Sequence, residues 1–211
     1  LSYCGQAIFS SATRMTGTAP AYRYRNRKRL KRRSLKCKYK IAHGTIIDYN
    51  ERQAEIDMKN YVSIDIGGTA IKYGLIREDG RILNRNIMNT EAAKGGAVIL
   101  EKVQNVIAEF HTQEEISGIC ISTAGVVDTN RGIITYSAPL IPDYAGTEYK
   151  KILENRFRIP CEVENDVNCA GLAEYYSGAA AGSNISLMLT VGTGIGGSIV
   201  INGEIFRGVS G

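Results

Sequence analysis

The sequence is poor in the residues that build metal centres and disulfide frameworks. It has two histidines and no tryptophan among 211 residues, and none of its five cysteines stands in a CxxC pair. This pattern argues against a zinc knuckle and against a disulfide-stapled secreted domain. No run approaches the ~20 consecutive apolar residues that a helix needs to cross a bilayer. We therefore expect a cytoplasmic protein with no membrane partner.

Acidic side chains are scarce in the first quarter of the chain and common after it. Residues 1–57 carry 13 Lys+Arg and 4 Asp+Glu, whereas residues 58–211 carry 13 and 17. The net charge of +5 therefore comes from a basic leader in front of a mildly acidic body. With 44% hydrophobic residues overall, the chain can bury a core.

The basic leader, residues 1–57, is open to four interpretations. Its clustered Lys/Arg could neutralise phosphates as a nucleic-acid-binding arm. Its basic, Ser-bearing start could be a transit peptide, or the segment could be a solvated tail. Alternatively it is not natural protein, and translation starts at Met58, directly before the first strand-like run. We favour the last interpretation, and so expect the leader to lie outside the fold and no nucleic-acid partner.

The body alternates strands and helices, and one unit occurs twice. Alternating apolar residues and turn signals predict strands over residues 61–66, 71–76, 81–86, 116–122, 132–136 and 161–164. Helical periodicity predicts helices over residues 97–111, 147–157 with Thr147 as N-cap, and 166–177. Residues 185–191, 198–201 and 204–206 repeat the opening order of strand, Gly/Thr loop, strand, Gly turn and strand, roughly 125 residues further on. The repeat predicts an α/β fold with two facing domains and a ligand between them.

The first loop, Asp65-Ile-Gly-Gly-Thr-Ala-Ile-Lys72, has the composition of a phosphate cradle. Gly67 and Gly68 lack Cβ atoms where a strand turns, so backbone N–H groups can approach an anion closely. Thr69 adds a hydroxyl donor. Asp65 could hold Mg²⁺ through water, because hard cations prefer carboxylate oxygen. Lys72 could reach a phosphate or could be an ordinary surface charge.

The second loop, residues 192–197, offers a matching cradle, with Gly192, Thr193 and Gly194 at its turn. Neither loop contains the GxxxxGK[ST] of a P-loop, and each leads into a strand, whereas a dinucleotide-binding fingerprint leads into a helix. Either loop alone would be an ordinary Gly-rich hairpin. At matching places in a duplicated unit, the two loops favour phosphate binding.

Asn165 and Asp166 stand at a strand-to-helix junction between the two loops. A lone Asp at such a junction is most often a helix cap. Phosphoryl transfer, however, needs one group that takes the proton of the acceptor hydroxyl. Asp166 has the position for that base, and the amide of Asn165 could hold neighbouring hydroxyls of the acceptor.

Four motifs, in the same order, resemble the ROK family, named for repressors, open reading frames and kinases. They are DIGGTAIK, STAGVVD, ENDVNCAGLAE and TVGTGIGGSIVINGEIFRG, and all lie within residues 58–211. Residues 142–146 and the NDVNCAGLAE stretch are most similar to N-acetylmannosamine kinase-like and β-glucoside kinase-like members of that family, which also includes glucokinase-like members.

The resemblance implies an actin-like, ribonuclease H-like α/β fold. It implies transfer of the ATP γ-phosphate to a sugar hydroxyl, usually O6, of a hexose or N-acetylhexosamine such as glucose or N-acetylmannosamine. It assigns Asp166 as the catalytic base, and Asn165 and Gly125 to the sugar pocket. It places ATP and Mg²⁺ around Asp65, Gly67, Gly68, Thr69, Gly192 and Thr193, with Lys72 and Gly194 beside them. Ala70 departs from the family, many of whose members carry a polar residue there.

Two other hypotheses stay open. One is a sugar-responsive ROK repressor, which would need an N-terminal helix-turn-helix; the leader shows no pair of amphipathic helices joined by a short turn. The other is an actin-like assembly protein or an acetate-type kinase, against which the ENDVNCA segment argues. We favour an ATP-dependent sugar kinase, a phosphotransferase with an alcohol group as acceptor.

We divide the chain into the leader, an N-terminal actin-like domain (residues 58–164) and the start of a C-terminal actin-like domain (residues 165–211). In the family, further sugar ligands and the adenosine pocket follow the last hairpin, as a structural zinc site often does. We therefore expect these parts after Gly211, and no turnover by residues 1–211 alone. Family members are commonly dimers, but the sequence leaves a full-length homodimer open, as it does the identity of the sugar.

Overall fold

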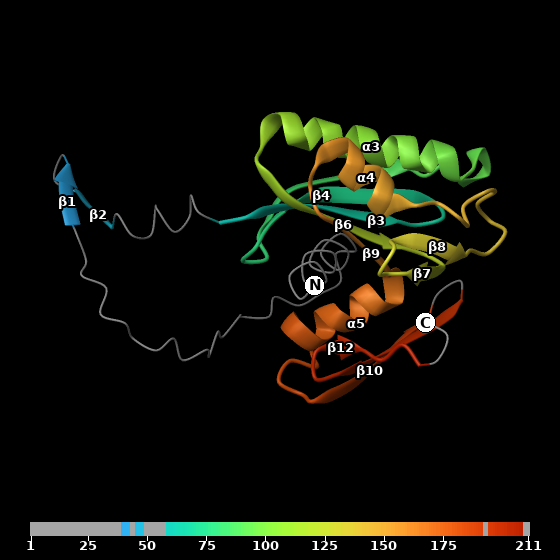
Figure 1. Ribbon diagram of the computed structural model, residues 1–211. Helices are drawn as coiled ribbons and strands as arrows, with labels where there is room; N and C mark the ends of the chain where they lie inside the picture. Colours follow the sequence, from blue (N-terminus) through green and yellow to red (C-terminus); the bar gives the residue numbers. More distant parts are fainter. Residues whose placement is uncertain (1–38, 43–44, 49–57, 192–193, 209–211) are drawn as a thin grey trace.

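The computed structural model describes residues 39–42, 45–48, 58–191 and 194–208 (Figure 1). A five-stranded sheet forms the centre of the body. Helices α3 and α4 cover one face of this sheet, and helix α5 with a second, smaller sheet lies on the other side (Figure 1). The strands of the central sheet are β3 (Asn60–Ile66), β4 (Ala70–Arg77), β5 (Ile82–Asn89), β6 (Ile116–Thr123) and β9 (Cys161–Asn165).

The central sheet is mixed, with the strand order β5-β4-β3-β6-β9. Strands β3, β4 and β5 form an antiparallel meander, whereas β6 and β9 run parallel to β3. The carboxyl ends of β3, β6 and β9 therefore meet at one edge of the sheet, where ligands bind in many open α/β sheets.

The hydrophobic core lies between the sheet and the helices α3 (Gly96–Gln113) and α4 (Tyr149–Phe157). Alternate residues of β3 point into it, because successive side chains of a strand face opposite sides. Helix α3 presents one apolar stripe at helical spacing. The buried members of that stripe are Ile99, Val103, Val106, Ile107 and Phe110.

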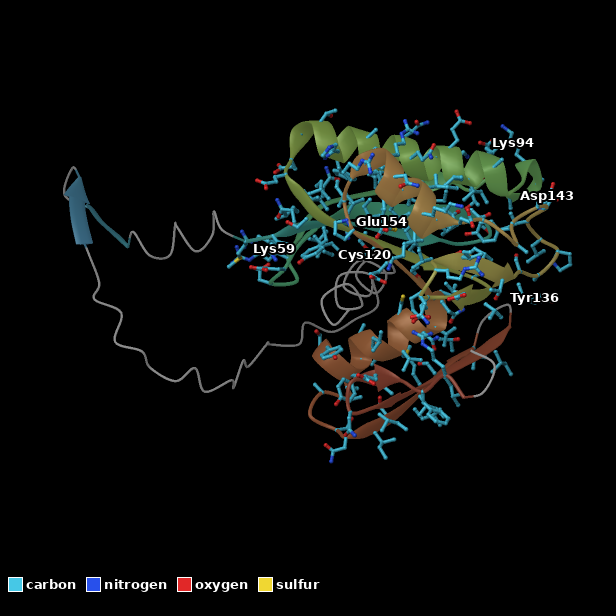
Figure 2. All side chains as sticks on the ribbon, viewed as in Figure 1. Lys59, Lys94, Cys120, Tyr136, Asp143 and Glu154 are labelled. Atoms are coloured by element: carbon cyan, nitrogen blue, oxygen red, sulfur yellow. The ribbon has the colours of Figure 1, made fainter. Side chains whose placement is uncertain are left out.

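The opposite face of the sheet is more polar and packs against α5 (Asp166–Ser177). Cys120 of β6 and Cys169 of α5 form a small buried cluster there with Tyr61, and Figure 2 shows Cys120 between the sheet and α5. Asp65 and Ser122 lie on this face as well, which places the polar face of the sheet beside the start of α5.

The second sheet consists of β10 (Ile185–Val191), β11 (Ile195–Ile201) and β12 (Glu204–Ile205), all antiparallel. Asn202 and Gly203, with φ of 51° and 89°, form the turn between the last two strands, as a type I′ turn requires. One face of the sheet packs on α5. Within the described part of the chain no element covers the other face, and four side chains on it are 64–84% exposed: Ile185, Leu187, Leu189 and Val191.

Short elements complete the described structure. Strands β7 (Val126–Asp128) and β8 (Ile133–Tyr136) pair with each other beside the end of β6, and the 3-10 turn η1 (Ala92–Lys94) precedes α3. Strands β1 (Tyr39–Ala42) and β2 (Thr45–Asp48) also pair only with each other. None of the helices in the described ranges combines the length and apolarity that crossing a membrane requires.

The structure confirms each strand and helix predicted for the body, most of them with shifted ends. The predicted Thr147 cap is wrong: Glu148 is the N-cap residue of α4 and makes no side-chain capping bond. The Thr147 hydroxyl instead donates to the Tyr144 carbonyl at 2.7 Å. Strand β7 was not predicted, because its three residues are too short for an alternating pattern.

Candidate functional site

A row of four polar side chains crosses the central sheet near its carboxyl edge. Lys72 pairs with Asp65, Asp65 with Ser122, and Ser122 with Glu164, on strands β4, β3, β6 and β9. Residues paired in register project to the same face of a sheet. The row therefore lies on the face that packs against α5.

Asp65 is the centre of this row. The Ser122 hydroxyl donates to Asp65 Oδ1 at 3.0 Å, and Lys72 Nζ lies 3.9 Å from Asp65 Oδ2. Burial raises the pKa of Asp65, while the Ser122 hydrogen bond and the Lys72 charge act in the opposite direction. A desolvated carboxylate of this kind gains from a nearby cation.

The oxygen donors around Asp65 suit Mg²⁺ that is shared with a substrate better than a metal ion that is bound by protein ligands alone. Among the residues that the structure describes, no group of three or more His, Cys, Asp or Glu could hold a metal ion. Mg²⁺ usually takes one or two carboxylates together with substrate phosphates and water. The single carboxylate of Asp65 fits that pattern.

The first glycine loop connects β3 to β4 beside Asp65. Gly68 and Thr69 are exposed, while the loop is closed by a hydrogen bond from Gly67 N to Ala70 O at 3.0 Å. A Cβ on Gly67 would lie only 3.0 Å from that same carbonyl oxygen. The tight turn therefore favours glycine at this position and leaves the next two residues facing outward.

The second glycine loop is described only in part. Gly192 and Thr193 lie outside the described residues, and Gly194 is exposed. The strand that follows approaches the start of α5 closely, because a Cβ on Gly196 would lie 2.5 Å from Val167 Cγ2. The described side of this loop therefore adjoins the helix that begins with Asp166.

Asn165, and not Asp166, caps helix α5. Asn165 Oδ1 accepts hydrogen bonds from the backbone N–H groups of Val167 at 2.9 Å and Asn168 at 3.2 Å. Asn165 Nδ2 donates to the Gly125 carbonyl at 2.9 Å. Much of the Asn165 amide is thus already used within the protein, which leaves it less free for a ligand than the sequence suggested.

Asp166 is exposed at the first turn of α5, and one carboxyl oxygen accepts from the Val167 N–H at 2.9 Å. Although the residue is exposed, the protein packed around it removes part of the water from its carboxylate, and this partial desolvation raises the pKa of Asp166. The Val167 hydrogen bond lowers it, and the charge of Asp65 raises it further. The pKa of Asp166, the predicted base, therefore depends on the charge of Asp65, the predicted Mg²⁺-binding carboxylate.

Gly125 stands in the turn between β6 and β7 with φ of 104°. A Cβ there would lie 2.5 Å from the Tyr136 carbonyl oxygen, so both conformation and space require glycine. A cavity of about 430 Å³ opens beside it, between the β9–α5 junction and the second sheet. Its walls include Gly125, Asn165, Asn168, Phe206 and Arg207.

This cavity has the size and mixed lining typical of small-molecule sites. Gly125 and Asn165 both line it, whereas Asp166, the next residue in the chain, is not part of its wall. A second hollow of about 380 Å³ lies between the start of α3 and the loop around Asp143. None of the predicted site residues lines that second hollow.

An ion pair joins the central sheet to the second sheet at the cavity wall. Both terminal nitrogens of Arg207 donate to the Glu164 carboxylate. Glu164 Oε1 also accepts from Asn165 N at 2.8 Å and from Asn168 Nδ2 at 3.1 Å. Glu164 thus connects Arg207 to Asn165, directly before Asp166, and to Asn168, two residues after it.

Sequence reasoning did not single out Ser122, Glu164 or Arg207. Each lies inside one of the four family motifs, so the motifs marked the region but gave these three residues no individual role. Thr90, which contacts the first glycine loop, lies in no motif, and nothing local in the sequence marks it.

Comparison with known proteins places these features in one family. The ROK family model matches residues 61–211. An uncharacterized protein of Clostridium perfringens is 53% identical over 150 residues, which cover 71% of this chain and 51% of that protein. A beta-glucoside kinase of Klebsiella pneumoniae is 37% identical over 150 residues, covering 69% of this chain and 49% of the relative.

A solved structure agrees with the sequence matches. The ROK family glucokinase from Streptomyces griseus, in complex with glucose and AMPPNP, superposes with a TM-score of 0.62 at 33% identity, over 72% of this chain and 47% of that one. The predicted actin-like α/β fold is thereby confirmed. The chain spans about half the length of the curated relatives it matches.

Proposed function

Because the chain belongs to the ROK family, we propose that it contributes the catalytic base and the phosphate loops of an ATP-dependent sugar kinase. The observation that carries this proposal is the polar row of Lys72, Asp65 and Ser122, next to the junction where Asp166 begins α5. A base, a cation site and a phosphate-binding loop are the parts that phosphoryl transfer needs.

The proposed chemistry is transfer of the γ-phosphoryl group to a sugar hydroxyl. The Asp166 carboxylate takes the hydroxyl proton, the sugar oxygen forms a bond to the γ-phosphorus, and the bond from that phosphorus to the departing ADP oxygen breaks. A raised pKa favours this role, because a general base works best when its pKa lies nearer the operating pH. Asp65 would hold Mg²⁺, which neutralises charge on the phosphates when bound.

We propose the cavity beside Gly125 as the sugar pocket. The acceptor class is a hexose or an N-acetylhexosamine, such as glucose or N-acetylmannosamine, phosphorylated at O6. The Gly125 carbonyl, which accepts one bond from Asn165, and the remaining N–H of the Asn165 amide would bind hydroxyl groups at one wall, while Phe206 offers an apolar surface to a ring face. We further propose that the first domain ends at Glu164 and that the enzyme is cytoplasmic.

The proposal is tested by measuring ADP release from ATP and Mg²⁺ against a panel of hexoses and N-acetylhexosamines, using the protein at its natural length. Sugar-dependent release is the expected result. A protein that binds a sugar and shifts DNA in a gel, without releasing ADP, would instead be a repressor of the same family. That outcome would overturn the proposed kinase activity.

A further inference from the structure

Three carbonyl groups of the first glycine loop are held by protein donors. Gly67 O accepts from the Thr90 hydroxyl at 2.6 Å, and Thr69 O accepts from the Thr90 backbone N–H at 3.0 Å. Ala70 O accepts from Gly67 N. The carbonyl dipoles of the loop are therefore turned toward the body of the protein.

The direction of the carbonyls fixes the direction of the loop's N–H groups. In a trans peptide unit the C=O and the N–H point to opposite sides, so Gly68 N–H points away from the Gly67 carbonyl. Gly68 and Thr69 are exposed, and neither N–H has an acceptor among the described residues. Free N–H groups aimed outward from a tight turn form an anion-binding concavity.

Thr90 is built into the structure firmly enough to hold this orientation. It is fully buried, with 0% of its surface exposed, and it follows β5 directly after the pair Ala70 and Asn89. Its own carbonyl accepts from Lys102 Nζ at 3.3 Å, and the same amine donates to Asn89 O at 2.7 Å. Lys102 of helix α3 thus holds the backbone around Thr90 in place, and Thr90 in turn holds the first glycine loop.

We propose that Thr90 is a positioning residue for phosphate binding: by holding the Gly67 carbonyl inward, it presents the Gly68 N–H to a phosphate of the nucleotide, and its bond to the Thr69 carbonyl anchors the other end of the turn. This inference rests on the proposed kinase function, since it names how that site recognises its nucleotide. Thr90 acts through the loop backbone and does not itself contact the ligand.

Two substitutions separate the hydroxyl from the shape of the side chain. T90V keeps the volume but removes the donor, which leaves the buried Gly67 carbonyl without its partner. T90S keeps the donor and removes a methyl group. T147V is a matched control, because the Thr147 hydroxyl also donates to a backbone carbonyl, at 2.7 Å, and within the described part of the chain Thr147 makes no hydrogen bond to the loop.

The test uses the whole chain, labelled for NMR, with inorganic triphosphate and Mg²⁺ as the probe. In the wild type, titration should shift the Gly68 and Thr69 amide signals. T90V should alter these signals before any ligand is added and should weaken the Kd about tenfold, the scale of one lost hydrogen bond. T90S and T147V should stay within about threefold of wild type.

The outcomes distinguish the inference from the proposed function. If the wild type binds triphosphate at this loop and T90V binds equally well, the role of Thr90 is overturned. The same holds if T90S weakens binding as much as T90V while both keep the wild-type melting temperature. If triphosphate leaves the loop amides of the wild type unshifted, the proposed nucleotide site itself fails, and with it the inference.

Discussion

Asp166 behaves unlike most aspartates at the start of a helix. The positive end of the helix dipole normally stabilises a carboxylate at this position and lowers its pKa. Here the pKa is raised instead, because partial desolvation and the charge of Asp65 outweigh the hydrogen bonds that lower it. Asn165 meanwhile satisfies the first free N–H groups of the helix, so the capping role does not depend on Asp166.

Asp166→Asn is the direct test of the proposed base. The amide keeps the size and can accept the Val167 hydrogen bond, but it cannot take a proton. We expect kcat of the natural-length protein to fall by about 10²- to 10⁴-fold, with little change in sugar affinity. Asp143→Asn, in a loop away from the cavity, is the control and should leave kcat unchanged. Activity of D166N near the wild-type level would exclude this residue as the base.

The coupling between Asp65 and Asp166 predicts a shift in the pH profile. The base must be deprotonated, so kcat/KM should fall as the pH drops through the raised pKa of Asp166. Asp65→Asn removes the negative charge that contributes to raising that pKa. The acid limb of kcat/KM should therefore move to lower pH, whatever the loss in maximal rate. A limb that stays in place, or moves to higher pH, would contradict the coupling.

At the scale of elements, the contact between α5 and β11 depends on a missing side chain. A Cβ on Gly171 would lie 2.0 Å from Ser198 Oγ and 3.1 Å from Ser198 Cβ. Gly171 is buried in the middle of α5, where glycine is otherwise a poor helix former. Close packing of the helix on the second sheet explains its presence.

Gly171→Ala should therefore destabilise the chain although alanine favours helices. Overpacking of this kind costs about 1–3 kcal/mol, measurable as a lower urea midpoint. Ser198→Ala alone should be neutral or mildly stabilising, because the Ser198 hydroxyl is buried without a partner among the described residues. The double variant should recover part of the loss. A G171A chain as stable as wild type would show that α5 can move away from β11 freely.

Elements of this size could largely be predicted from the sequence, and the reason is that their signals are local. Helix α5 was predicted with the ends it has, because a strand precedes it and Gly178 ends it. The Asn202-Gly203 turn was predicted from two adjacent residues. The Thr147 cap failed because the hydroxyl bonds backward, to the Tyr144 carbonyl three residues earlier, and the helix begins one residue later, with Glu148 as N-cap.

At the scale of the whole molecule, the Glu164–Arg207 pair ties the central sheet to the segment that follows β12. The side chain of Glu164 is 15% exposed and that of Arg207 is 37% exposed, so solvent screens the pair in part. A double-mutant cycle with Glu164→Gln and Arg207→Met should give a coupling of up to about 1 kcal/mol in unfolding free energy. High salt should reduce it. A coupling of zero at low salt would show that the two sheets are not joined by this contact.

Contacts at this scale were beyond sequence reasoning because they join residues far apart in the chain. Glu164 and Arg207 are 43 residues apart, Asp65 and Ser122 are 57 apart, and Gly67 and Thr90 are 23 apart. Residue type shows that each can form a hydrogen bond, but only the strand order decides which partners meet. The motifs located the site, and the parallel pairing of β3, β6 and β9 assembled it.

Successive side chains of β3 face opposite sides of the sheet, so the number of residues in the strand matters as much as their identity. Ile64 and Ile66 face the helices, and Asp65 between them faces the opposite side. Deleting a single residue near the middle of β3 would move every later side chain of the strand to the opposite face of the sheet. An isoleucine would then occupy the proposed cation site and the aspartate would face the hydrophobic core, so a change in spacing alone could abolish the proposed site although all of its residues were retained.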